Sequence, residues 1–179
     1  MTENSVTKNT TYLTLSYIGQ KFLSFFYFVM VARFIGVEDL GKYTFALGFT
    51  TMFAVFIDLG LTQALIRETA KFKEKAENYL SSILGVKLSL SVLIYLLVII
   101  LVNLMNYPEI TKQLVYIAGV IMVIDSFTLS FWGIFRGARN LKYEAIGIAG
   151  SQGITLVLGS IFLFLGFPLI YLIFSFTFA

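Results

Sequence analysis

Five stretches of about 20 mostly apolar residues, followed by a sixth that begins near Pro168, fill nearly all of this chain of 179 residues. A helix that crosses the hydrocarbon core of a bilayer needs about 20 such residues at about 1.5 Å each. On this measure the sequence predicts membrane spans at about 12–35, 43–65, 80–104, 114–135, 145–165 and 168–179, the last of them incomplete. The expected fold class is all-α: a polytopic transmembrane helix bundle of about six helices.

The composition places the chain outside the class of soluble globular proteins. Hydrophobic residues make up 58% of the sequence and charged residues only 13%, whereas soluble domains average about 25% charged residues. The net charge is +3, but the basic residues lie mainly in short connections beside apolar runs, where they orient membrane proteins. We therefore expect the lipid bilayer as a partner and no nucleic acid.

The residue inventory gives little support to an enzyme. The absence of cysteine and histidine removes disulfides, thiol chemistry and imidazole-based metal or acid–base chemistry. Glu38 and Asp39 are the only adjacent acids, and acids at the start of a helix are most simply first-turn charges. No glycine-rich phosphate loop, nucleophile setting or convergent carboxylate cluster is visible in the sequence. We expect no catalysis, no cofactor and no metal.

Alternate connections between the spans carry unequal numbers of basic residues. The group that includes the N-terminus contains Lys8, Arg67, Lys71, Lys73, Lys75, Arg136, Arg139 and Lys142. The other group contains Arg33, Lys42 and Lys112. Because cytoplasmic connections carry the excess of Lys and Arg, the N-terminus is expected in the cytoplasm. Within the first group, segment 67–79 fits either an amphipathic helix at the membrane surface or a solvated loop.

Five charged residues inside or at the edge of the spans are the candidate site residues: Lys21, Arg33, Asp58, Lys87 and Asp125. A charge near the bilayer centre costs about 2.5–3.5 kcal/mol, so it usually faces a polar cavity or a partner. Asp58 and Lys87 lie seven residues, about 10 Å, from the cytoplasmic ends of consecutive spans, which predicts an ion pair. Lys21 and Asp125 fall near the midplane and are expected to pair or to line one cavity.

The same charges allow a second interpretation. The two lysines can extend along their aliphatic stems to the cytoplasmic interface, and Arg33 can extend to the outer one. Aspartate has a short stem, so Asp58 and Asp125 favour a cavity or a buried pair, or a protonated carboxyl group that hydrogen-bonds within the bundle.

Small and polar residues recur at helical spacing near these charges. The polar stripes are Ser16, Gln20 and Ser24; Lys87, Ser91 and Tyr95; and Asp125, Thr128 and Trp132. Such stripes can line a hydrated path, although Ser and Thr also mediate helix contacts in lipid. The glycines of the fifth span predict close helix approach: Gly147, Gly150, Gly153 and Gly159.

Three segments resemble a known family. Residues 32–43 read ARFIGVEDLGKY, residues 56–68 read FIDLGLTQALIRE, and residues 135–143 read FRGARNLKY. The first two are similar to the N-terminal signature of polysaccharide-biosynthesis membrane proteins, and the third to a basic cytoplasmic turn of the same proteins. They include the O-antigen type flippases of the multidrug, oligosaccharidyl-lipid and polysaccharide exporter superfamily.

The resemblance implies a transporter of twelve to fourteen helices in two lobes, of which residues 1–179 form a single membrane lobe, the N-terminal one. Such a protein moves a lipid-linked oligosaccharide across the prokaryotic cytoplasmic membrane by alternating access, between the two lobes. The anionic pyrophosphate of the lipid carrier would call for Lys21, Lys87 and Arg33. Asp58 and Asp125 would hold these cations or relay a coupling ion, H⁺ or Na⁺. The alternatives are a multidrug or cation antiporter of the same superfamily and a noncatalytic membrane assembly subunit.

Overall fold

A computed structural model of the chain describes residues 3–177, and every regular element within this range is helical. The elements are α1 (Glu3–Asp58), α2 (Leu61–Lys71), the 3₁₀ turn η1 (Lys73–Lys75), α3 (Ala76–Leu104), α4 (Glu109–Gly137), α5 (Lys142–Phe164) and α6 (Leu169–Thr177). The all-α class and the expected number of about six helices are confirmed. The side chain of Lys8 and the last two residues of the sixth predicted span lie outside the described part of the chain.

Three segments of the described chain are long and apolar enough to cross a membrane. They are Lys73–Leu104, Glu109–Gly137 and Lys142–Phe164, with mean hydropathies of 2.6, 2.0 and 1.7. The pair Thr10–Asp58 and Leu61–Lys71 also passes when taken together and is bent by 45°. The chain therefore contains three candidate spans, or up to four if the bent pair counts as one.

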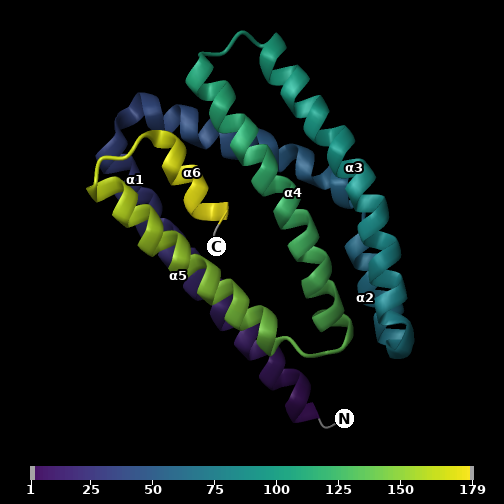
Figure 1. The fold of residues 1–179 in the computed structure, drawn as a ribbon. Coiled ribbons are helices and arrows are strands. Elements are labelled where there is room, and N and C mark those ends of the chain that lie inside the picture. Colours follow the sequence, from purple (N-terminus) through teal and green to yellow (C-terminus); the bar gives the residue numbers. More distant parts are fainter. Residues whose placement is uncertain (1–2, 178–179) are drawn as a thin grey trace.

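Helix α1 changes direction at Gly36, where the backbone has φ 76° and ψ 169°. Only glycine adopts this conformation without strain. The two arms of α1 diverge from the bend (Figure 1). We expected a connection at residues 36–42, but the helix resumes directly after Gly36 because one residue suffices for the turn. Lys42, on the first turns of the second arm, pairs with Glu38 and Asp39 at 2.9 Å each.

A second break separates α1 from α2. Leu59 and Gly60 both have positive φ, 40° and 83°, and this interruption falls inside the predicted span 43–65. Helix α2 then continues to Lys71, followed by the 3₁₀ turn and by α3. Segment 67–79, for which a helix and a loop were both open, is thus helical on either side of a short break at Phe72.

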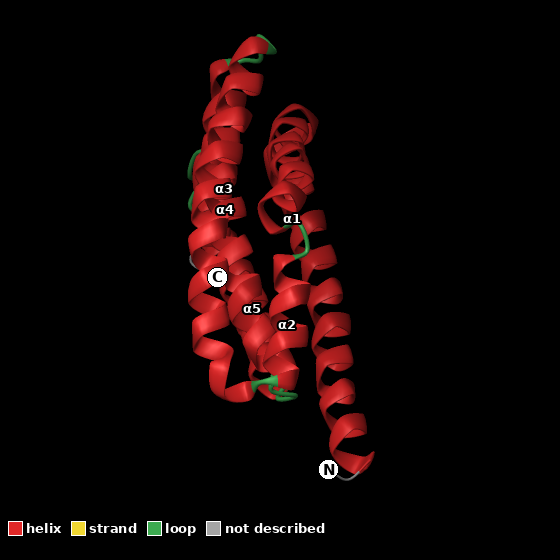
Figure 2. Ribbon diagram, turned by 90° about the vertical axis from the view of Figure 1, so that its right-hand side faces the viewer, coloured by secondary structure: helices red, strands yellow, loops and turns green. Residues whose placement is uncertain are grey.

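The helices form two layers. Figure 2 shows α1 beside the layer that contains α3, α4 and α5. Helix α1 packs on α4 and α5, and α2 packs between α3 and α4. Side chains with no exposed surface fill the contacts between the helices: Val31, Ile57, Val98, Leu114 and Ile173.

The connections occupy two ends of the bundle. The α2–α3 and α4–α5 connections lie at the end where the N-terminus is found, and the α3–α4 connection lies at the opposite end (Figure 1). The two basic segments that the charge count assigned to one side of the membrane, 67–75 and 136–142, are thus at the same end of the bundle.

Two of the four glycines in α5 make close contacts. A Cβ atom at Gly147 would lie 2.4 Å from the Trp132 ring, and one at Gly159 would lie 2.3 Å from the Tyr27 hydroxyl. The predicted close approach is confirmed at these positions. It is wrong for Gly150 and Gly153, where an added Cβ would meet no atom within 4 Å outside its own stretch of helix.

Replacing the glycine at the bend tests its role. Gly36→Ala places a Cβ in a strained backbone region, and we expect it to lower the stability of the full-length protein by about 1–3 kcal/mol. Gly41→Ala is the matched control, because Gly41 is helical with open space around it and alanine favours a helix by about 0.5–1 kcal/mol. Thermal unfolding of the detergent-solubilised protein, followed by circular dichroism, measures both. An equal Tm for the two variants would contradict the proposed strain.

Candidate functional site

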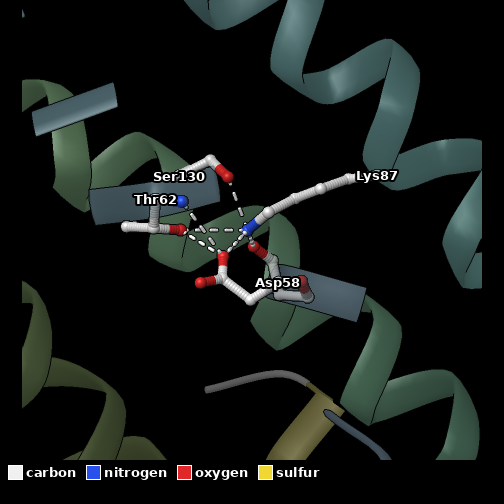
Figure 3. A network of polar contacts seen from close by, with 5 residues as sticks. Asp58, Thr62, Lys87 and Ser130 are labelled. Carbon is white, nitrogen blue, oxygen red and sulfur yellow. Dashed lines mark hydrogen bonds and ion pairs between the residues drawn. The ribbon is translucent and has the colours of Figure 1, made fainter. Parts of the chain in front are cut away.

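The break after α1 brings a carboxylate to a buried lysine. Asp58 is the last residue of α1, and its Oδ1 lies 2.6 Å from Nζ of Lys87 on α3 (Figure 3). The side chain of Lys87 has no exposed surface, whereas that of Asp58 is 24% exposed. The ion pair predicted from the depths of these two residues is confirmed.

Three acceptors surround the Lys87 ammonium group. Besides Asp58, it donates to Oγ1 of Thr62 at 3.1 Å and to the carbonyl oxygen of Ser126 at 2.7 Å. An ammonium group has three donors and no acceptor, so its hydrogen-bonding capacity is fully used. Because the side chain is enclosed, Lys87 does not extend to a membrane interface in this structure.

The same carboxylate completes the start of α2. Oδ1 of Asp58 accepts hydrogen bonds from the Thr62 backbone N–H at 3.3 Å and from the Thr62 hydroxyl at 2.5 Å. The first N–H groups of a helix have no partner within the helix, so a carboxylate there stabilises its N-terminus. The network joins α1, α2, α3 and α4 around one positive charge.

A second ion pair ties α4 to α5. Arg136 donates through Nε to both oxygens of Glu144, at 2.9 and 3.1 Å, and through Nη2 to Oε1. Tyr17 of α1 donates to Oε1 of Glu144 at 3.3 Å and accepts from Nη2 of Arg136 at 3.2 Å. The Glu144 side chain is 1% exposed. Sequence reasoning missed Glu144, because an acid in the first turn of a helix after a basic connection is typical of a solvated residue.

A cavity of about 530 Å³ lies between α1, α4 and α5. Its polar lining residues are Tyr17, Gln20, Asp125, Thr128, Arg136, Glu144, Ser151, Gln152 and Thr155. All three residues of one predicted stripe are among its lining residues: Asp125, Thr128 and Trp132. Asp125 is exposed there, and within residues 3–177 its carboxylate forms no hydrogen bond or ion pair. The same part of the chain contains no group of three acidic residues that could hold a metal ion.

The structure does not bring Lys21 or Arg33 into these networks. Lys21 is exposed on the first arm of α1 and does not line the cavity with Asp125, where its neighbour Gln20 is found instead. Arg33 is exposed further along the same arm. Among the described residues neither side chain has a hydrogen bond or an ion pair. The expected pairing of Lys21 with Asp125 is therefore absent.

The helices and their paired intramembrane charges define a polytopic helical membrane protein. The family described as "Polysaccharide biosynthesis protein" matches residues 6–179, so the chain belongs to this family. A curated relative, "Capsular polysaccharide biosynthesis protein CapF" of Staphylococcus aureus, is 26% identical over 170 residues. The match covers 95% of this chain and 38% of the relative. No solved structure gives a significant match.

The two partners of the buried pair are expected to respond unequally to substitution. Asp58→Asn leaves a fully enclosed ammonium group without its carboxylate, and we expect a loss of about 3 kcal/mol. Lys87→Met should cost less, because Asp58 is partly exposed and can be hydrated. The exposed Lys71→Met is the control, with an effect of about 0.5 kcal/mol or less. Thermal unfolding of the full-length protein measures the stability of all three variants. Equal losses in Asp58→Asn and Lys87→Met would contradict the inference that the enclosed lysine depends more on the pair than the partly exposed aspartate does.

In the second pair, removal of the cation is expected to cost more stability than removal of the acid. Arg136→Met strands the buried Glu144 carboxylate, with an expected loss of about 3 kcal/mol, and Tyr17→Phe removes one hydrogen bond worth about 1 kcal/mol. Glu144→Gln should be milder than Arg136→Met, since the Arg136 side chain is 28% exposed. Arg67→Met, at a side chain that is 69% exposed, serves as the control in the same unfolding assay. A Glu144→Gln variant less stable than Arg136→Met would overturn this order.

Proposed function

We propose that this chain forms the N-terminal lobe of a noncatalytic transporter that flips a lipid-linked oligosaccharide for cell-surface polysaccharide synthesis. The family match supports a role in polysaccharide biosynthesis, and the name of the S. aureus relative concerns capsular polysaccharide. The location is a prokaryotic cytoplasmic membrane, with the N-terminus and both basic connections in the cytoplasm. The shared end of these connections in the bundle fits the positive-inside rule.

The observation that carries the proposal is a pair of cations on one helix arm that have no acidic partner among the described residues. Lys21 and Arg33 are exposed on α1, about 18 Å apart along the helix. Large apolar side chains are exposed around Lys21, including Phe22 and Phe25. A cation in such a surface needs an anion or a polar path at membrane depth. The pyrophosphate that links an oligosaccharide to its lipid carrier is such an anion.

The set of anion-binding residues is smaller than the sequence predicted. Every donor of Lys87 is used inside the bundle, so in this conformation no donor is left for a substrate phosphate. We assign phosphate binding to Lys21 and Arg33 and a structural role to Lys87. The chain spans 38% of the length of its relative, and the second lobe of the proposed transporter lies in the remaining part of the whole protein. The substrate path then runs between the two lobes.

Charge substitutions on α1 test the proposal in the full-length protein. We expect Lys21→Ala and Arg33→Ala each to slow the flipping of lipid-linked oligosaccharide in proteoliposomes about tenfold, because a charged hydrogen bond contributes about 1.5–3 kcal/mol. Lys21→Arg should retain most of the activity. Lys71→Ala, in the basic connection, is the control for a loss of positive charge elsewhere.

Other outcomes identify the alternatives. Unchanged flipping in both alanine variants, with normal amounts of folded protein, would contradict the assigned anion site. A native protein that exports cationic drugs and moves no lipid-linked oligosaccharide would be an antiporter. A native protein without any transport, whose alanine variants lose folded protein, would be an assembly subunit.

A further inference from the structure

A groove of about 450 Å³ follows the contact between the first arm of α1 and α5, two segments that lie side by side (Figure 1). This α1–α5 groove is lined by residues within 12–23 and 142–149. Several of them are small: Ser16 and Gly19 of α1, Ala145 and Ala149 of α5. A Cβ atom at Gly19 would meet no atom within 4 Å outside its own stretch of helix. The small side chains therefore leave open a space that larger ones would fill.

The α1–α5 groove has a cation at one end and mostly apolar side chains elsewhere. Lys142, the first residue of α5, is the one charged residue among the described residues that line it. Its side chain is exposed, and within residues 3–177 it forms no hydrogen bond or ion pair. The nearby Glu144 does not line the groove, because it is buried against Arg136 and Tyr17. The groove is thus complementary to an anion that carries an apolar chain.

The start of α5 adds a second attraction for an anion. Its N-cap residue, Leu141, makes no side-chain hydrogen bond to the helix. The first N–H groups of a helix have no partner within the helix and form the positive end of its dipole, where a phosphate group binds favourably. The Lys142 ammonium group and these N–H groups therefore attract an anion to the same end of the groove.

The α1–α5 groove has the length of one leaflet of a membrane. Its lining on α1 extends from Tyr12 to Leu23, about 16 Å along the helix, and half of the hydrocarbon core of a bilayer is about 15 Å. Lys142 follows the α4–α5 connection, at the end of the bundle that carries both basic segments (Figure 1). A cation there lies at the level of the lipid headgroups, and basic pockets between helices at this level bind anionic headgroups.

We propose that the α1–α5 groove binds one anionic phospholipid of the surrounding membrane, with its phosphate at Lys142 and one acyl chain between α1 and α5. Lipid tails are as apolar as the groove, so the chain contributes packing and the headgroup contributes the selectivity. The site is separate from the proposed oligosaccharide path, since neither Lys21 nor Arg33 is among its lining residues. The inference therefore does not depend on what the protein transports.

Native mass spectrometry of the full-length protein in detergent measures this binding. The probes are phosphatidylglycerol and phosphatidylethanolamine with identical acyl chains. We expect phosphatidylglycerol to bind about tenfold more tightly at the highest-affinity site, and Lys142→Ala to remove this preference, because a hydrogen bond to a charged group gives a difference of about this size. Lys142→Arg should keep the preference. Lys71→Ala, at an exposed cation of the same end of the bundle, is the control and should leave it unchanged.

A second variant tests the groove itself, and it also serves if Lys142→Ala does not fold. Gly19→Leu places a branched side chain in the open space and should weaken the binding of both lipids. Gly48→Leu is the matched control, because Gly48 lies on the second arm of α1 with equally open surroundings and does not line the groove.

Three results would overturn the proposal. Equal affinity of the native protein for both lipids, or a preference that survives in Lys142→Ala, would contradict the assigned headgroup. Lipid binding that is unchanged in Gly19→Leu would contradict the assigned groove, as expected if the second lobe covers it. Displacement of phosphatidylglycerol by lipid-linked oligosaccharide, with both ligands lost in Lys142→Ala, would make the groove part of the substrate site. A native protein that flips nothing would contradict the proposed function and leave these results unaffected.

Discussion

The enclosed ammonium group of Lys87 is the constraint on which the lobe is organised. A lysine with no exposed surface at membrane depth is tolerable only if acceptors surround its charge. The acceptors come from the end of α1, the first turn of α2 and the backbone of α4. The two residues with positive φ, Leu59 and Gly60, lie between two of these partners, Asp58 and Thr62.

Two classes of intramembrane charge emerge from the geometry. Asp58 with Lys87, and Arg136 with Glu144, neutralise one another at junctions between helices. Lys21, Arg33 and Asp125 have no such partner among the described residues and lie on exposed surface or in the cavity. The first class joins helices, and the second contains the residues to which we assign ligand binding. The two classes differ in burial and pairing, which the sequence does not reveal. The five candidates chosen from the sequence therefore include members of both classes.

The fold class and one ion pair were predictable because lipid leaves the backbone few choices. Every peptide group must bond within its own helix, so long apolar runs identify helices, and equal depth then pairs Asp58 with Lys87. The bend at Gly36 was not predictable, because a glycine permits an unusual conformation without requiring it. Lys21 was expected to pair with Asp125 or to line one cavity with it, but Gln20 lines that cavity instead. Neighbouring residues of a helix point about 100° apart, and depth alone does not fix the direction in which a side chain points.

Lys87 binds α4 through a peptide oxygen, and this has a consequence for how homologues of this chain should be aligned. A carbonyl group is present whatever amino acid occupies position 126, so the contact tolerates substitution there. The number of residues between Ser126 and Arg136 is constrained, because Lys87 holds the first position and Glu144 holds the second. One inserted residue would rotate the guanidinium group of Arg136 by about 100° away from Glu144. Among relatives as distant as the S. aureus protein, which is 26% identical to this chain, the number of residues along α4 should therefore be kept more strictly than their identities. An alignment that opens a gap there is suspect on physical grounds.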